Sequence, residues 1–364
     1  MSDFNLPADH RPYIDKYFLR AKEVLVKDNL NPTVKAQVFI RNGNCRVYGI
    51  DETIAILSKY ADTTKLKVCA LKEGDSIQKC ETVLTIEAPI QEIMDLETMY
   101  LGVISAETTK KNDGDISIAD IETNMRKIVD LAKGRPVSYF GARHWRWDMD
   151  AIIAKACFDA GATSCSTDIG GATVNQEGVG TIPHALECIY HWKYGLKRAV
   201  VEATKAFDKY IDKIVPRIAL IDYANREIRD SLTTIAEIPH LYGVRVDTCG
   251  ENYMQGCYPS VDDDNDKFNF GKGVCTFGVS ELTRIIKDEG DYKVILSSGF
   301  GNPEKLEEFL AAEEALDCHL FDGLGVGGVY DARISTMDII EVEGQEIHKV
   351  GRPAKPNEKL QRII

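Results

Sequence analysis

The sequence lacks the cysteine spacing of a metal cluster or of a disulfide framework. Its ten cysteines are scattered from Cys45 to Cys318, and no two of them form a C-x-x-C pair. Zinc sites and small secreted scaffolds both depend on close and regular cysteine spacing. We therefore expect free thiols in a reducing cytosol, and we interpret Cys165, beside a candidate site, as a packing residue and not as a nucleophile.

Long apolar runs, a targeting segment and an excess of positive charge are also missing. No apolar stretch approaches the roughly 20 residues that span a bilayer, and residues 1–7 have neither a basic region nor an apolar core. The formal net charge of −13 at pH 7 does not suit a nucleic-acid partner. Backbone amides and a few local cations can still hold phosphorylated small molecules. We expect a cytoplasmic protein with small-molecule partners, and neither a nucleic acid nor a membrane as partner.

The chain does contain a repeated pattern of apolar strand, polar turn and helix. The pattern is clearest from Pro136 to His191, where a helical segment at 149–160 has apolar residues at the spacing of one buried face. From Pro136 onward, roughly six or seven such units follow one another, close to the number that a barrel needs. This alternation of strands and helices is typical of an α/β fold with parallel strands, either a βα barrel or a doubly wound sheet.

We predict three parts along the chain. Residues 1–115 form an α+β N-terminal domain, because strand-like patterns fill 34–93 between two helical segments. Residues 116–332 form the βα-barrel domain, and residues 333–364 form a hairpin and tail that pack back on the N-terminal domain. The acidic run at 262–266 predicts a solvated excursion over the mouth of the barrel.

Candidate site residues follow predicted strands, where side chains of a βα fold face the ligand. Arg245 and Asp247 alternate along one strand and so point to the same face. A guanidinium suits a carboxylate, and an aspartate suits sugar hydroxyls. The alternative interpretation is an internal salt bridge between the two.

Glycine-rich turns follow the last two predicted strands, at 297–301 and 325–328. Glycines allow backbone amides to approach an anion closely, and this corner of a barrel commonly binds phosphate. Ordinary tight turns explain the same glycines equally simply.

Three basic side chains lie at other predicted turns. His184 begins a helix after Gly180-Thr-Ile-Pro183, which suits a nucleophile or an acid–base group. A histidine that only caps the helix is the alternative. Arg143 and His144 follow another strand, and they either bind an anion or are surface charges.

Six segments, taken in chain order, resemble the motifs of the nicotinate phosphoribosyltransferases, a type II phosphoribosyltransferase family, and in particular its archaeal-type members. Together they are specific, and the likeness covers nearly the whole chain. The segments are Asp15-Lys-Tyr17-Phe-Leu-Arg20, Phe140-Gly-Ala-Arg143-His144, Gly178-Val-Gly-Thr-Ile-Pro-His184, Arg245-Val-Asp247-Thr248, Ser298-Gly299 and Gly325-Val-Gly327.

The resemblance implies an incomplete βα barrel of about seven strands with an α+β N-terminal domain, paired as a homodimer or a higher homo-oligomer. It also implies a reaction of NAD salvage, in which nicotinate and phosphoribosyl pyrophosphate give nicotinate mononucleotide and pyrophosphate. Mg²⁺ is the expected cofactor, although no residue is assigned to it, and ATP is the expected co-substrate.

The resemblance further implies roles for the matching residues. His184 and Asp247 are the catalytic candidates, since His184 matches the family's phosphorylatable histidine and Asp247 would hold the ribose hydroxyls. Tyr17 would stack on the pyridine ring, from the partner subunit, unless it is only an interface aromatic. The other candidates are Arg20, Arg143, His144, Ser166, Thr167, Arg245 and Thr248 for substrate binding, and Ser298, Gly299, Gly325 and Gly327 for phosphate binding.

One departure bears on the substrate. The chain reads Cys165-Ser166-Thr167-Asp168 where the family has Thr-Ser-Asn-Val. Relatives that use nicotinamide have an aspartate at the place of Ser166, so serine favours the acid, and an inward-facing Asp168 would weaken that preference. Nicotinamide or quinolinate phosphoribosyltransferase activity and a non-catalytic nucleotide-binding regulatory barrel remain the alternatives.

Overall fold

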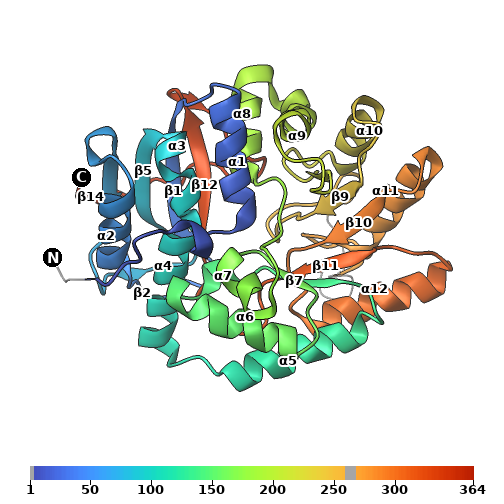
Figure 1. The fold of residues 1–364 in the computed structure, drawn as a ribbon, viewed down its shortest axis with the longest axis horizontal. Coiled ribbons are helices and arrows are strands. Elements are labelled where there is room, and N and C mark those ends of the chain that lie inside the picture. Colours follow the sequence, from blue (N-terminus) through green and yellow to red (C-terminus); the bar gives the residue numbers. More distant parts are fainter. Residues whose placement is uncertain (1–3, 259–267) are drawn as a thin grey trace.

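The computed structural model describes residues 4–258 and 268–364, which form two six-stranded sheets that lie side by side (Figure 1). One sheet is antiparallel and has strands from the N-terminal and C-terminal parts of the chain, and the other is parallel. The acidic run at 262–266, with its predicted excursion, lies outside the described residues.

The antiparallel sheet joins the N-terminal and C-terminal parts of the chain. Its strand order is β13-β12-β1-β5-β3-β14. In β1, Val34, Ala36, Val38 and Ile40 alternate toward the core and are buried, as expected of a strand. The strands are β1 (Thr33–Ile40), β3 (Lys67–Ala70), β5 (Thr82–Pro89), β12 (Ser335–Val342), β13 (Gln345–Glu346) and β14 (Gln361–Arg362), while β2 (Cys45–Arg46) and β4 (Ser76–Ile77) pair separately.

A helix interrupts the region in which the sequence pattern predicts only strands. The helices of this part are α1 (Lys16–Lys27), α2 (Ile50–Tyr60), α3 (Ile90–Ile93) and α4 (Glu97–Asp113), and α2 corrects the expectation. Its start has no local capping side chain, because Gly49 precedes it in a left-handed conformation. Glu73 caps it instead, since its carboxylate accepts the backbone N–H groups of Gly49 and Asp51 at 3.1 and 2.9 Å.

The parallel sheet has the order β7-β6-β11-β10-β9-β8. The strands are β6 (Val137–Tyr139), β7 (Ser164–Cys165), β8 (Ile218–Leu220), β9 (Gly243–Val246), β10 (Lys293–Leu296) and β11 (Gly323–Val326). The helices around them are α5 (Ile118–Leu131), α6 (Asp150–Asp159), α7 (Asp168–Gly171), α8 (His184–Tyr194), α9 (Ala199–Tyr210), α10 (Glu227–Glu237), α11 (Thr276–Glu289) and α12 (Pro303–Leu316). Helical crossovers are what parallel pairing requires.

The mixed α/β fold is therefore confirmed. Within the described ranges the six parallel strands form an open sheet with β7 and β8 at its edges, and they do not close into a barrel. Neighbouring strands end at the same level of the sheet, because their last residues pair: Leu296 with Val246, and Val326 with Tyr139. This register brings the residues that follow four different strands to a single edge.

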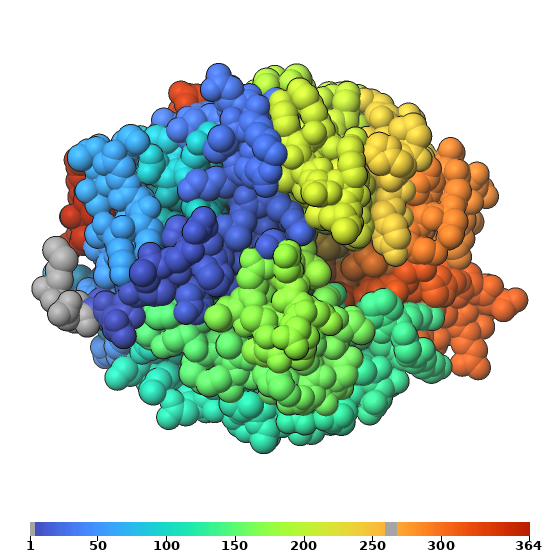
Figure 2. Space-filling model, viewed as in Figure 1, coloured from blue at the N-terminus to red at the C-terminus, as the bar shows by residue number. Residues whose placement is uncertain are grey.

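The N-terminal part packs directly against the parallel-sheet part. Helix α1 contacts α9, and the backbone N–H of Lys16 donates to the carbonyl of Ser166 at 2.7 Å. Figure 2 shows this contact as blue N-terminal residues lying against green and yellow-green ones. The domain boundaries at 115 and 332 stay predictions. Among the described residues, none of the helices is long and apolar enough to cross a membrane.

Candidate active site

A cavity of about 530 Å³ lies at the carboxyl edge of the parallel sheet, between the two parts of the chain. Residues from α1, α4, β12 and the segment after β13 line one side, and residues that follow the parallel strands line the other. Most of the candidate residues lie here, namely Tyr17, Arg143, His144, His184, Arg245, Asp247, Ser298, Gly299, Gly325 and Gly327.

Four candidates do not line the cavity, and their substrate contacts stay predictions. Arg20 donates to the carbonyl of Gly180. Thr167 donates to Asp150, and Thr248 donates to Glu227 at 2.8 Å. Ser166 is buried beside the start of α1. Three of these four therefore position loops behind the cavity wall through their side chains.

Arg245 and Asp247 face the cavity from the end of β9, as the alternation predicts. Their closest atoms, Nη1 and Oδ2, are 3.4 Å apart, which is long for an ion pair with a hydrogen bond. The other Arg245 contacts, to Ser297 Oγ and the Ile182 carbonyl, measure 3.4 and 3.3 Å. Ser297 donates to Asp247 at 2.9 Å. Loosely held in this way, the guanidinium keeps donors for a ligand carboxylate.

The two glycine turns touch each other. An ideal Cβ built on Gly301 would lie 2.0 Å from the carbonyl oxygen of Gly328, so only glycine allows this approach. Ser298 and Gly299 have φ values of 67° and 89°, and Lys305 donates to the carbonyl of Ser298 at 2.9 Å. Helix α12 begins directly after this turn, so its free N–H groups add to an amide-rich corner that suits a phosphate.

His184 is part of a three-residue charge network. Its Nε2 lies 3.0 Å from Oδ1 of Asp222, which is fully buried, and Lys349 contacts both side chains. The sequence interpretation missed Asp222, although a signal exists. Leu220 pairs with Arg245 across β8 and β9, so Asp222 occupies the same strand-end place as Asp247. Lys349 comes from the C-terminal segment and has no comparable local signal.

The network fixes the protonation of both groups. Burial lowers the pKa of His184, the charge of Lys349 lowers it further, and Asp222 opposes them, so the ring is neutral at pH 7. Burial raises the pKa of Asp222, but Lys349 and His184 outweigh it and hold that pKa below its usual range. The carboxylate accepts a hydrogen bond from Nε2–H, which leaves the ring's lone pair at Nδ1.

Arg143 lies beside two carboxyl groups: Asp15, which belongs to the N-terminal motif, and Glu97, which sequence reasoning did not find. Its Nε lies 3.3 Å from Asp15 Oδ2 and its Nη1 3.5 Å from Glu97 Oε1. Burial raises the pKa of Glu97 to about 8, although the charge of Arg143 opposes that rise. The Tyr17 ring centroid lies 5.8 Å from the Arg143 guanidinium. Tyr17 thus lines the cavity of its own chain, and its stacking on a pyridine ring from a partner subunit stays a prediction.

His144 holds a turn and is not a cation. Its Nδ1 lies 3.1 Å from the carbonyl oxygen of Gly327, to which an Nδ1–H would donate. Burial, followed by the charge of Arg143, lowers the pKa of His144 to about 4, so the ring is neutral at pH 7. Its role is therefore to fix the second glycine turn.

Asp168 points away from the cavity lining. Lys16 Nζ lies 2.8 Å from its carboxylate, which also accepts the backbone N–H of Gly178 at 2.9 Å. The extra carboxylate noted beside Ser166 therefore ties α1 to the loop before α8. It leaves the preference for an acid substrate intact.

Arg41 and Arg352 also line the cavity, and carboxylates neutralise both. Arg41 Nη1 lies 2.6 Å from Glu251 Oε1, and Arg352 Nη2 lies 3.2 Å from Glu251 Oε2. Arg352 Nη1 contacts Asp338 at 3.3 Å. When only the nearest carboxylate of each arginine at this cavity is compared, the distance is longest for Arg245, at 3.4 Å against 3.3 Å for Arg143.

Comparisons with known proteins agree with the motifs. Residues 15–107 match the family model described as "Quinolinate phosphoribosyl transferase, N-terminal domain". A nicotinate phosphoribosyltransferase from Porphyromonas gingivalis aligns with 93% of this chain and 92% of its own, at 13% identity and a TM-score of 0.66. A putative nicotinate phosphoribosyltransferase from Saccharomyces cerevisiae aligns with 96% and 94%, at 14% identity and a TM-score of 0.65. The chain has the fold of the type II phosphoribosyltransferases.

A nicotinate-nucleotide pyrophosphorylase from Pyrococcus furiosus is 26% identical over the whole chain and 86% of its own, with a TM-score of 0.45. No curated protein matches the sequence. The resemblance drawn from the motifs is confirmed at the level of the fold, and the enzyme activity that it implies stays a prediction.

Proposed function

We propose that the protein is a nicotinate phosphoribosyltransferase that forms nicotinate mononucleotide and pyrophosphate from nicotinate and phosphoribosyl pyrophosphate. One observation carries the proposal. A single cavity brings together the loosely held Arg245 and its neighbour Asp247, two touching glycine turns, and His184 with its buried partner Asp222.

Each group suits one part of the reaction. Displacement of pyrophosphate builds positive charge on the ribose ring and negative charge on the leaving group. The carboxylate of Asp247 suits the ribose hydroxyls, and the amide-rich turns at 298–301 and 325–328 suit the 5′-phosphate. Arg245 suits the carboxylate of nicotinate, and the Tyr17 ring suits the face of the pyridine. Holding both reactants in line supplies a large part of the rate enhancement.

The ion pairs favour a base with one carboxylate. The nearest carboxylates to Arg143, Arg352 and Arg41 lie at 3.3, 3.2 and 2.6 Å, and the nearest carboxylate to Arg245 lies at 3.4 Å. Arg245 therefore has N–H donors that no close carboxylate occupies, and nicotinate has the one carboxylate that they would bind. A base with two carboxylates would need a second cation to leave its present partner.

Coupling to ATP is the second element of the proposal. A neutral imidazole with its lone pair at Nδ1 is a nucleophile, and Asp222 would stabilise the charge that forms when Nδ1 takes a phosphoryl group. In family members, phosphohistidine links ATP hydrolysis to nucleotide formation. His184 is the matching residue here.

The residues at the cavity also fit Mg²⁺ bound through substrate. Mg²⁺ usually takes one or two carboxylates together with substrate phosphates and water. Asp247 is 26% exposed at the cavity and fits that role. In the part of the chain that the structure describes, no cluster of three or more His, Cys, Asp or Glu side chains could hold a metal. When bound, the ion would neutralise charge on the leaving pyrophosphate.

Quinolinate is the second candidate substrate, because the matching family model is described by that base. The two proposals, together with nicotinamide, separate in one assay. Pyrophosphate release is measured with phosphoribosyl pyrophosphate and each of the three bases, with and without ATP. We expect turnover with nicotinate, stimulated by ATP, and turnover with quinolinate alone would overturn the proposal.

Labelling with [γ-³²P]ATP tests the histidine. We expect acid-labile label on the wild-type protein and none on His184→Ala. His191→Ala is the matched control, since His191 lies two turns further along α8 and does not line the cavity. The homodimer or higher homo-oligomer that the resemblance implies belongs to the same proposal, and sedimentation of the purified protein tests it. The cytoplasmic location expected from the sequence belongs to the proposal as well.

A further inference from the structure

Two cysteines outside the cavity lie almost within bonding distance of each other. The Sγ atoms of Cys257 and Cys275 are 3.4 Å apart, although the residues are 18 positions apart in the chain. Cys257 is partly exposed and Cys275 is buried. The pairing was not visible in the sequence, where the two residues have no motif spacing.

The backbone on both sides holds the two thiols together. Tyr253 and Gly273 form a β-bridge, and the N–H of Gly273 donates to the carbonyl of Asn252 at 2.7 Å. The N–H of Cys257 donates to the carbonyl of Met254 at 3.0 Å, and this turn sets the position of its side chain. Backbone pairing just before each cysteine therefore ties the two segments together and places the sulfur atoms in contact.

We propose that Cys257 and Cys275 are a redox-active pair that forms a reversible intramolecular disulfide. A disulfide bond is about 2.05 Å long, so the two sulfur atoms need to approach by little more than 1 Å. Cys275 directly precedes α11, where free backbone N–H groups favour a thiolate. The hydrogen bond from Cys257 lowers the pKa of Cys275, which matches this arrangement.

The oxidant is a small-molecule disulfide such as glutathione disulfide. The hydrogen bond to Cys275 raises the pKa of Cys257, but Cys257 is the more exposed thiol and so the one that a glutathione disulfide can reach. Cys257 loses its proton and attacks one glutathione sulfur. The glutathione S–S bond breaks, and one glutathione leaves and takes up that proton. Cys275 then loses its proton and attacks the Cys257 sulfur, the mixed disulfide breaks, and the second glutathione leaves and takes up that proton. Two protein thiols are oxidised and one glutathione disulfide is reduced to two glutathiones.

A metal site is a poor alternative use of the same thiols. Two sulfur ligands are half of a structural zinc site. The described residues contain no group of three or more suitable ligands, so none of them completes such a site beside the pair.

The pair lies beside the wall of the proposed active site. Cys249 and Gly250 line the cavity a few residues before Cys257, and α11 follows Cys275. A disulfide would close a loop between these two segments and so restrict the unfolded chain. We therefore expect the oxidised protein to melt at a temperature several degrees higher than the reduced protein.

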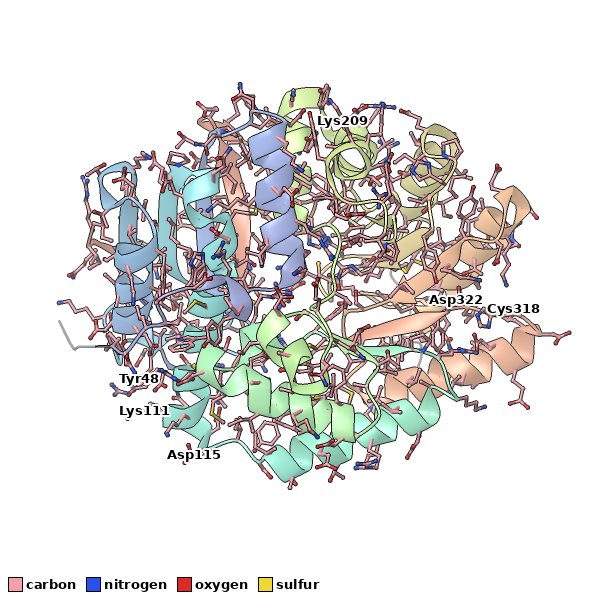
Figure 3. The ribbon with its side chains drawn as sticks, viewed as in Figure 1. Tyr48, Lys111, Asp115, Lys209, Cys318 and Asp322 are labelled. Atoms are coloured by element: carbon pink, nitrogen blue, oxygen red, sulfur yellow. The ribbon has the colours of Figure 1, made fainter. Side chains whose placement is uncertain are left out.

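The experiment oxidises the full-length protein in a buffer rich in glutathione disulfide and maps its peptides by mass spectrometry without reduction. We expect a peptide pair linked through Cys257 and Cys275, which dithiothreitol separates. Cys318, which is exposed near the end of α12 (Figure 3), serves as the internal control, because it should take up one glutathione under the same conditions.

Two variants complete the test. Cys257→Ser should lose both the linked peptide and the rise in melting temperature, and Cys318→Ser should keep both. The proposal is overturned if Cys318 reacts while Cys257 and Cys275 stay reduced, or if Cys257 takes up glutathione that Cys275 does not displace. It is also overturned if oxidation raises the melting temperature of Cys257→Ser as much as that of the wild type.

Discussion

His184 Nε2 lies 3.0 Å from Oδ1 of Asp222, a carboxylate that has no exposed surface. A buried carboxylate that accepts a hydrogen bond from one ring nitrogen selects the tautomer whose lone pair is on the other. The pair therefore orients His184 and stabilises positive charge on it. Lys349 contacts both side chains and keeps the buried carboxylate ionised.

Asp222→Asn should lower labelling of His184 by ATP, and ATP-stimulated turnover, by about 100-fold or more, the lower range for removal of an acid–base partner. The amide cannot stabilise a charged imidazole and leaves Lys349 without its anion. Asp222→Asn combined with Lys349→Met removes that unpaired charge and controls for misfolding. Both variants should be equally poor in labelling, and full labelling of Asp222→Asn would refute the role assigned to the carboxylate.

Arg245→Lys should raise the KM for nicotinate by roughly 10- to 100-fold and leave the KM for phosphoribosyl pyrophosphate within about threefold. Lysine keeps the charge but loses the planar fork that binds a carboxylate through two donors. Steady-state kinetics with each substrate varied in turn measure both constants. Arg284→Lys is the matched control, since Arg284 forms an exposed ion pair with Glu281 on α11. A larger effect on phosphoribosyl pyrophosphate than on nicotinate would reassign Arg245 to the phosphates.

Elements with strong local signals were predictable from the sequence. Helix α8 has the bounds expected for it, His184–Tyr194, because its apolar pattern begins after Pro183 and ends before Gly195. Strand β10 is a short apolar run flanked by polar residues, and it also matches. Helix α2 was not predicted, since the group that caps it is Glu73, more than 20 residues away. Local patterns cannot contain a cap of that kind.

The same distinction applies to the cavity. Arg245, Asp247 and the glycine turns were found because they follow strands, and the register of a parallel sheet brings strand ends together. Glu97 and Lys349 were not found, because they reach the cavity from α4 and from the C-terminal segment. Their place depends on how the antiparallel part packs against the parallel sheet, which no motif specifies.

Gly301→Ala should weaken binding of phosphoribosyl pyrophosphate by about tenfold or more. The added methyl group would lie 2.0 Å from the Gly328 carbonyl oxygen, so the two turns must move apart. Their backbone N–H groups would then no longer point at the same phosphate. Gly328→Ala makes the same chemical change in the facing turn, but its Cβ meets no heavy atom within 4 Å. Its effect on the KM for phosphoribosyl pyrophosphate should be clearly smaller, and equal effects would show that the close approach is unimportant.

Glu97→Gln should change the pH dependence of stability in a defined direction. Burial raises the pKa of Glu97 from 4.5 to about 8, so the folded protein keeps a proton that the unfolded chain loses. The proton on Glu97 adds to the free energy of unfolding. This contribution is fully present below about pH 4.5 and is lost as the pH rises toward 8. Glutamine has no such loss.

The free energy of unfolding of Glu97→Gln, relative to wild type, should therefore rise between pH 5 and pH 8.5, by an amount on the order of a few kcal/mol. Urea unfolding at both pH values measures this difference between the two proteins, which cancels the titration of other buried acids such as Asp150. Asp15 and Arg143 remain paired in both proteins, so the change reports Glu97 alone. A difference that is constant with pH would show that Glu97 is ionised throughout and that its proton does not contribute to the charge balance around Arg143.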